Sequence, residues 1–197
     1  EMCIRDSYMS TGFFSMVRKR GVWLIILFIG EMFTASAMGF YEHELKKAVV
    51  LALFIPLIIS SGGNTGSQAS TLIIRALALK ELQLKDWWKV LYREIGAGVC
   101  LGLILASIGF VKIYFWKQND PIFANNYFPI ALVVSLSLVC VVAWGTIVGS
   151  ILPFILRRLG LDPASASAPF VATIVDVTGL VIYFSLASII LKEINFF

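Results

Sequence analysis

The sequence predicts an all-α integral membrane protein with five transmembrane helices in each chain. Apolar residues make up 59% of the 197 residues, charged residues make up only 14%, and the mean hydropathy is +0.88. Soluble domains carry about 25% charged residues, so this composition excludes an ordinary soluble protein. The apolar runs are continuous rather than alternating, which favours helices over membrane-spanning strands.

Five apolar stretches are long enough to cross a bilayer, which takes about 20 helical residues. The second stretch is too long for one straight crossing. At about 1.5 Å per residue it would measure on the order of 48 Å, against a hydrocarbon core of about 30 Å. We therefore expect it to tilt, break or continue into the cytoplasm. In chain order the predicted spans are Val22–Phe40, Ala48–Leu79, Ile95–Phe115, Phe128–Leu156 and Ala164–Leu191.

Basic residues are distributed unevenly between the two sides of the membrane. Most precede the first span, lie between the second and third spans, or follow the fourth span as Arg157 and Arg158. Because Lys and Arg accumulate in cytoplasmic loops, we predict a multi-pass plasma-membrane protein with its N-terminus in the cytoplasm and its C-terminus outside. The net charge of +4 reflects this loop bias, and we predict no nucleic-acid partner.

The chain is predicted to form one ion-conducting transmembrane domain, residues 21–192, between an N-terminal segment (1–20) and a tail (193–197). Residues 1–10 show neither apolar periodicity nor a helix-capping pattern, so we expect a disordered start or sequence foreign to the natural protein. There is no phosphate-binding G-x-x-x-x-G-K-[ST] loop, no H-E-x-x-H motif and no nucleophile elbow. We therefore predict that the chain is not an enzyme.

A polar segment interrupts the second span between Pro56 and Gln68. Unsatisfied peptide groups in lipid cost several kcal/mol, so such a segment must pack in protein or line a wet cavity. Asn64 and Gln68 are four residues apart and therefore project from one helical face. Amide oxygens are hard ligands that do not titrate, which favours Mg²⁺, Ca²⁺ or Mn²⁺. The glycines that thin the backbone beside them are Gly62, Gly63 and Gly66.

Two carboxylates, Glu31 and Asp176, lie at membrane depth. A charge there costs about 2.5–3.5 kcal/mol even on insertion scales, so each is a functional hypothesis. Asp176 is predicted to share a polar helical face with Thr173 and Gly179. The alternative for Asp176 is an interhelical hydrogen bond without function. For Glu31, a threonine partner or simple protonation would serve equally well.

Proline and glycine positions predict local helix geometry. Asp162 and Pro163 are typical of a helix start, with Asp as the N-cap and Pro at the first helical position. Pro169 cannot donate a backbone hydrogen bond, which frees the carbonyl four residues earlier. The pairs Gly98-x-x-x-Gly102 and Gly145-x-x-x-Gly149 indicate close helix packing.

Together these motifs resemble the transmembrane domain of the MgtE family of magnesium channels. The resemblance covers about residues Arg18 to Leu191. It implies a homodimer of five-helix subunits, with an ion path between subunits lined by the second and fifth helices. It also implies a pore Mg²⁺ held mainly by the aspartate that matches Asp176. The matching segments are Pro56 with Gly62–Gln68, Thr71–Ala78, Asp162–Ala164, and Pro169–Asp176 with Ala172 and Thr173.

The resemblance further implies a long cytoplasmic N-terminal region with Mg²⁺-sensing modules. About twenty residues precede the first predicted span here. Gating by intracellular Mg²⁺ is therefore not assigned to this chain, and a separate cytoplasmic regulator is a candidate partner. Ala168 stands where some family members have asparagine, which would leave Asp176 to bear more of the ion binding.

The sequence thus predicts a transporter of channel type that conducts hydrated or partly hydrated Mg²⁺ into the cell down its electrochemical gradient. Co²⁺ and Mn²⁺ are candidate further ions, and Mg²⁺ is the bound as well as the transported ion. Two copies of Asp176 on a two-fold axis would match the charge of a divalent ion. Two alternatives stay open: a proton- or sodium-coupled divalent cation exchanger, and a non-transporting membrane subunit whose polar stripe binds a partner helix.

Overall fold

A computed structural model describes residues 12–41, 49–116, 121–160 and 168–193. Within these ranges the chain forms helices and no strands. The prediction of an all-α fold is therefore confirmed. The first ten residues, the predicted helix start at Asp162 and Pro163, and most of the predicted tail lie outside the described residues.

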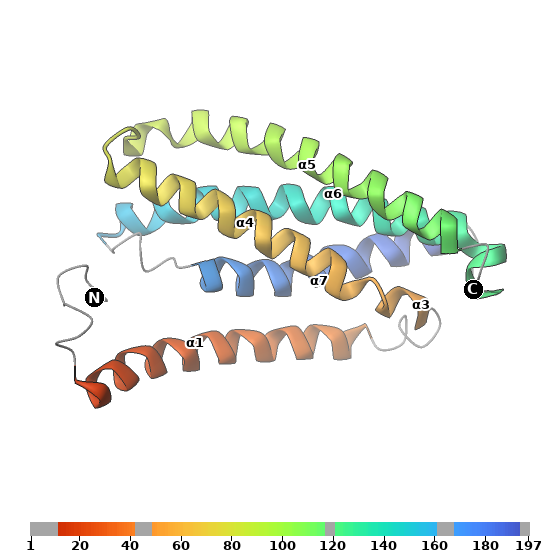
Figure 1. Cartoon of the computed structure of the whole chain (residues 1–197), viewed down its shortest axis with the longest axis horizontal. Helices are drawn as coiled ribbons and strands as arrows, with labels where there is room; N and C mark the ends of the chain where they lie inside the picture. The colour runs from red at the N-terminus through yellow and green to blue at the C-terminus, as the bar shows by residue number, and fades with distance from the viewer. Residues whose placement is uncertain (1–11, 42–48, 117–120, 161–167, 194–197) are drawn as a thin grey trace.

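The helices run lengthwise, side by side, in a bundle (Figure 1). α1, α5 and α7 run in one direction along it, and α4 and α6 run in the other. A short 3₁₀ helix, η2, precedes α5. The elements are α1 (Phe13–Phe40), α3 (Val49–Ala52), α4 (Ile55–Ala78), η2 (Leu84–Asp86), α5 (Trp87–Trp116), α6 (Pro121–Arg158) and α7 (Ala168–Glu193).

The long second stretch breaks, as its length requires. α3 ends at Ala52, two residues intervene, and α4 begins at Ile55 with Pro56 in its first turn. The amide of Phe54 donates to the carbonyl of Leu51 at 3.1 Å, which closes a tight turn at the break. The hydroxyl of Tyr183 in α7 donates to the same carbonyl at 2.8 Å. The Leu51 carbonyl at the break thus has two donors inside the protein, where a membrane interior would offer none.

Four helical segments of the described chain are long and apolar enough to cross a membrane: Val49–Ala78, Leu84–Trp116, Tyr127–Arg158 and Ala168–Lys192. They correspond to the second to fifth predicted spans. The first predicted span lies in α1, a helix of 28 residues, of which the stretch Leu24–Phe40 is found as an apolar segment among the residues searched. A fifth crossing by α1 stays a prediction.

Helix α6 packs against α4, α5 and α7, and small residues bring its backbone close to α4 and α5. A Cβ atom built on Gly145 or Gly149 would collide with the carbonyl oxygens of Gly62 and Gly66 on α4. Gly102 on α5 is similarly tight, since a Cβ there would lie 2.7 Å from the Cα of Val139 on α6. The two predicted glycine pairs are therefore packing positions.

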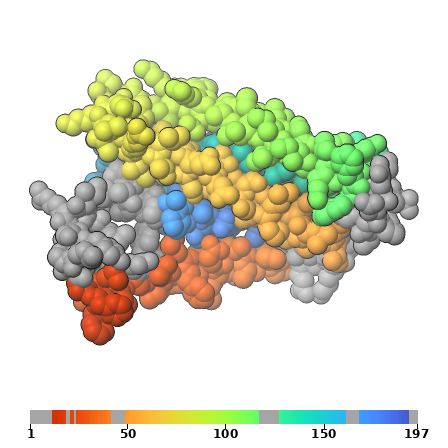
Figure 2. All heavy atoms as spheres, in the orientation of Figure 1, coloured from red at the N-terminus to blue at the C-terminus, as the bar shows by residue number. Residues whose placement is uncertain are grey.

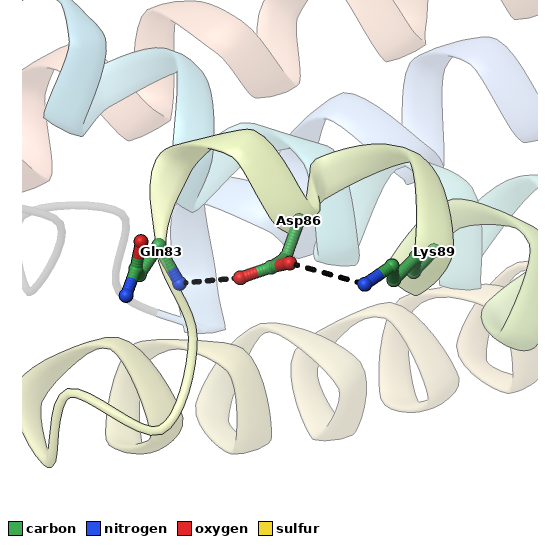
Figure 3. Close-up of polar contacts among 3 residues, drawn as sticks. All are labelled: Gln83, Asp86 and Lys89. Atoms are coloured by element: carbon green, nitrogen blue, oxygen red, sulfur yellow. Dashed lines mark hydrogen bonds and ion pairs between the residues drawn. The ribbon is translucent and has the colours of Figure 1, made fainter.

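The turn between α4 and α5 is fixed by a reciprocal cap (Figure 3). The backbone amide of Gln83 donates to Oδ2 of Asp86 at 3.0 Å. The side chain of Gln83 completes the capping box of η2 in return. Lys89 lies 3.7 Å from Oδ1 of Asp86. Nearby, Arg157 of α6 donates to the carbonyl of Leu77 at 3.1 Å, near the end of α4. These contacts hold one end of the bundle together.

Candidate ion-binding cavity

A cavity of about 450 Å³ lies between α1, α4 and α7. Figure 2 shows α7 at the bottom of a furrow between α1 and α4. The lining combines two carboxylates with an amide, two hydroxyls and an apolar remainder. It is formed by Glu31, Thr34 and Met38 of α1, by Ile55, Pro56, Ile59, Ser60, Gly63 and Asn64 of α4, and by Ala172, Asp176 and Leu180 of α7.

Asp176 lies half-buried in this cavity, two turns into α7. The cavity face of α7 has a spacing of four residues, through Ala172, Asp176 and Leu180. Gly63 of α4 lies opposite: a Cβ built on it would be 3.4 Å from Oδ1 of Asp176 and 3.6 Å from the Cβ of Ala172. The absence of a side chain at Gly63 thus leaves room beside the carboxylate.

Glu31 lines the same cavity from α1 and is held by two threonines. The hydroxyl of Thr173 on α7 donates to Oε1 of Glu31 at 3.1 Å, and the hydroxyl of Thr34 donates to Oε2 at 3.4 Å. Gly30 permits this approach, because a Cβ built there would lie 2.5 Å from the methyl group of Thr173. The threonine partner foreseen for Glu31 is therefore present, and it comes from another helix.

Of the two amides predicted to share a polar face of α4, only Asn64 lines the cavity. Asn64 lines the cavity, and its amide nitrogen donates to the hydroxyl of Ser60 at 3.2 Å. The amide oxygen is then the atom of Asn64 that can face an ion. Gln68 is exposed one turn further along α4, outside the cavity lining.

The remaining predicted site residues lie around the cavity rather than in its wall. Gly62, Gly66 and Gly179 face α6, where Cβ atoms built on them would meet Val141 or the backbone of Gly145. Pro169 is in the first turn of α7, and its carbonyl, 3.1 Å from the Thr173 hydroxyl, is the alternative acceptor for that hydroxyl's proton. Whether any of these residues lies on a conduction path stays a prediction.

Sequence reasoning missed Ser60 and Thr34 as parts of the site. Ser60 lies four residues before Asn64, and Thr34 lies three after Glu31, so helical spacing alone could have indicated both. No three His, Cys, Asp or Glu side chains converge within the described residues. The donors of the cavity are instead carboxylate, amide and hydroxyl oxygens, a set suited to a hard cation that keeps part of its water shell.

Fold and cavity together define a multi-pass helical membrane protein with an acidic cavity between its helices. A sequence model of the MgtE family, described as a divalent cation transporter, matches residues 55–186. The chain belongs to this family, which is one of transporters and not of enzymes.

Curated relatives agree with this assignment. The chain is 43% identical over 188 residues to the magnesium transporter MgtE of Thermus thermophilus, covering 95% of this chain and 40% of the relative. It is 32% identical over 174 residues to MgtE of Enterococcus faecalis, covering 88% and 37%, and 30% identical over 184 residues to MgtE of Bacillus subtilis, covering 93% and 39%. The chain thus spans about two-fifths of the length of these curated relatives.

Proposed function

We propose that this chain forms the ion-conducting transmembrane domain of a magnesium transporter, with Asp176 as the principal ion-binding residue. In this proposal two chains associate as a homodimer, each contributing five spans from residues 21–192 with α1 as the first. The observation that carries the proposal is the position of Asp176 in a polar cavity of an MgtE-family helix bundle.

The size and chemistry of the cavity suit a hydrated magnesium ion. Mg²⁺ holds six ligands in an octahedron and gives up its waters reluctantly. Six waters occupy roughly 180 Å³ at about 30 Å³ each, less than the 450 Å³ of the cavity. Asp176, Asn64 and Ser60 can therefore hold the ion through its waters without stripping it. Co²⁺ and Mn²⁺ are expected to enter as well, because the same oxygen ligands accept them.

A two-fold arrangement would match the charge of the site to that of the ion. One Asp176 supplies one negative charge, whereas two copies facing each other across the dimer axis supply two. In the empty pore these carboxylates repel each other, and a divalent cation relieves that repulsion better than a monovalent one. Selectivity then follows from charge and size together.

The direction of transport follows from orientation and potential. Arg18, Arg75, Lys85 and Arg157 lie at the end of the bundle where α1, α5 and α7 begin. By the positive-inside rule this end is cytoplasmic, with the N-terminus inside and the C-terminus outside. An inside-negative potential supplies about 2.3 kcal/mol per charge per 100 mV, hence roughly 4.6 kcal/mol for Mg²⁺. Influx therefore needs no ATP.

Mg²⁺ influx into liposomes that contain only this chain tests the proposal. The vesicles carry an inside-negative potential, with equal pH and Na⁺ on both sides. We expect influx that follows the potential and is lost in Asp176→Asn, which keeps the shape of the side chain and removes its charge. Ser107→Ala is the matched control. Its hydroxyl is exposed on α5 and donates to the Leu103 carbonyl, so influx should persist.

The outcomes separate the alternative functions. Influx that appears only with a proton or sodium gradient would indicate a coupled exchanger. Full influx in Asp176→Asn would exclude Asp176 as the ion site. No influx from correctly folded dimers would mean that this chain alone does not conduct, as expected for a non-transporting subunit.

A further inference from the structure

Helix α1 is the least enclosed wall of the cavity. Its main packing partner is α7, and Ile25, Phe28 and Phe33 on its other faces are each half exposed or more. In its middle, α1 meets α7 where Gly30 and Glu31 face Thr173. At its end, the hydroxyl of Tyr41 lies 3.3 Å from that of Ser185. Tyr41 also stacks on Phe184, with ring centroids 5.0 Å apart, so the contact with Thr173 is the polar contact between α1 and α7 that lies beside the cavity.

The Thr173 hydroxyl has two acceptors and only one proton. It lies 3.1 Å from Oε1 of Glu31 and 3.1 Å from the carbonyl of Pro169. The Pro169 carbonyl also receives the ordinary helical bond from the backbone amide four residues later, so it does not depend on the hydroxyl. Glu31 has no such backbone donor, and a bond to a carboxylate is stronger than one to a neutral carbonyl. The Thr173 hydroxyl therefore donates its proton in a hydrogen bond to Glu31 rather than to the Pro169 carbonyl.

We propose that Glu31 is a positioning residue of the ion cavity: through the Thr173 hydroxyl it holds α1 against α7 and so keeps the α1 wall opposite Asp176. This inference rests on the proposed function, because the cavity it completes is the one assigned to Mg²⁺. It assigns to Thr173 a structural bond between helices rather than contact with the ion. Loss of the bond lets α1 move outward and widens the cavity.

Two substitutions isolate the bond. Thr173→Val keeps the shape and the methyl group that touches Gly30 but removes the donor, and Glu31→Ala removes the acceptor. We expect each to raise the Mg²⁺ concentration for half-maximal thermal stabilisation about tenfold, the usual effect of losing a hydrogen bond to a charged group. The double variant should be no weaker than the worse single variant, because both changes break the same contact. Thr173→Ser, which retains the hydroxyl, should remain close to the unsubstituted chain.

A disulfide between positions 30 and 173 would fix α1 against α7 and so tests directly whether the position of α1 controls Mg²⁺ binding. A Cβ built on Gly30 lies 3.9 Å from the Cβ of Thr173, within the range of about 3.5–4.5 Å that disulfides need. In a chain whose native cysteines are replaced, Gly30→Cys with Thr173→Cys should bind Mg²⁺ as tightly as the unsubstituted chain when oxidised. When reduced, it should bind about tenfold more weakly, like Thr173→Val. Ser36→Ala is the matched α1 control, because its hydroxyl bonds only to the Met32 carbonyl.

Each result of these experiments either supports or overturns the role proposed for Glu31. Unchanged affinity in Thr173→Val beside a large loss in Glu31→Ala would mean that Glu31 acts independently of α7, and would overturn the proposal. Equal affinity of the oxidised and reduced disulfide variants would also overturn it. If the unsubstituted chain binds Mg²⁺ but shows no flux, the proposed conduction fails while the affinity comparison still decides the role of Glu31. If it shows neither binding nor flux, both proposals fall.

Discussion

Replacing Gly149 with alanine should force α4 and α6 apart. A Cβ built on Gly149 collides with the carbonyl oxygen of Gly66 and lies 2.7 Å from its carbonyl carbon and 2.9 Å from its Cα. Ordinary van der Waals contact begins at 3.4 Å, so the separation from that carbon must grow from 2.7 Å to 3.4 Å. The atoms that are struck belong to the main chain of another helix. No side-chain rotation can move them aside.

The expected cost follows from two opposing effects. Overpacking a tight contact costs about 1–3 kcal/mol, and a backbone neighbour places Gly149→Ala toward the upper end. Alanine itself is more favourable than glycine in a helix by roughly 0.5–1 kcal/mol. The steric effect wins, for a net loss of about 2 kcal/mol in the free energy of unfolding.

Gly96→Ala provides the matched comparison on α5. Nothing lies within 4 Å of a Cβ built on Gly96, so only the helix-propensity gain applies, and this variant should be slightly more stable than the unsubstituted chain. The free energy of unfolding of both variants can be measured by reversible unfolding in mixed detergent micelles, monitored by circular dichroism. Equal stability of the two variants would show that the glycine contact between α4 and α6 is not formed, and would refute the reasoning.

Two further predictions concern hydrogen bonds at the ends of the bundle. Asp86→Ala should lower the free energy of unfolding by about 1 kcal/mol through loss of the cap on Gln83, whereas Lys89→Ala should change it by less than about 0.5 kcal/mol, because the Lys89 side chain is 85% exposed. Equal effects in the same unfolding assay would contradict this. Tyr183→Phe should cost about 1 kcal/mol, because the Leu51 carbonyl keeps its bond from the Phe54 amide. A loss above about 3 kcal/mol would mean that the carbonyl is left unpaired.

The features that sequence reasoning predicted well are those set by bilayer thickness and composition. The length of the second stretch exceeds the hydrocarbon core, and the chain does break before Pro56. Continuous apolar runs required helices, and the helices are present. The first predicted span, Val22–Phe40, lies within α1, a helix of 28 residues, and its crossing of the membrane stays a prediction.

The direction of each side chain could not be predicted in the same way. Gly62, Gly63 and Gly66 lie within about one helical turn, yet Gly63 lines the cavity and the other two face α6. The sequence shows that a glycine is small, but it does not show which neighbouring helix that glycine will contact. The polar stripe expected from Thr173 through Asp176 to Gly179 divides for the same reason, since only Asp176 of the three lines the cavity.

The partnership of Glu31 with Thr173 was also beyond local reasoning. The two residues are 142 positions apart, and nothing in the spacing of either segment indicates that α1 lies beside α7. A threonine partner was one of the two alternatives for Glu31, and the structure contains one, although the Glu31 side chain is exposed rather than buried. Its origin on another helix depends on the packing of the whole bundle.

The glycine contact between α4 and α6 has a consequence for the timescale on which the cavity can change shape. Exposed side chains change rotamer within picoseconds to nanoseconds, whereas displacements of whole helices take microseconds to milliseconds. Gly66 and Gly149 place main chain directly on main chain, so no rotamer separates the helix that carries Asn64 from its support. The α4 wall can then move only as a rigid body, on the microsecond-to-millisecond timescale of helix displacement. On shorter timescales the backbone of the α4 wall keeps its position, and only the side chains that line the cavity, such as Asn64, move.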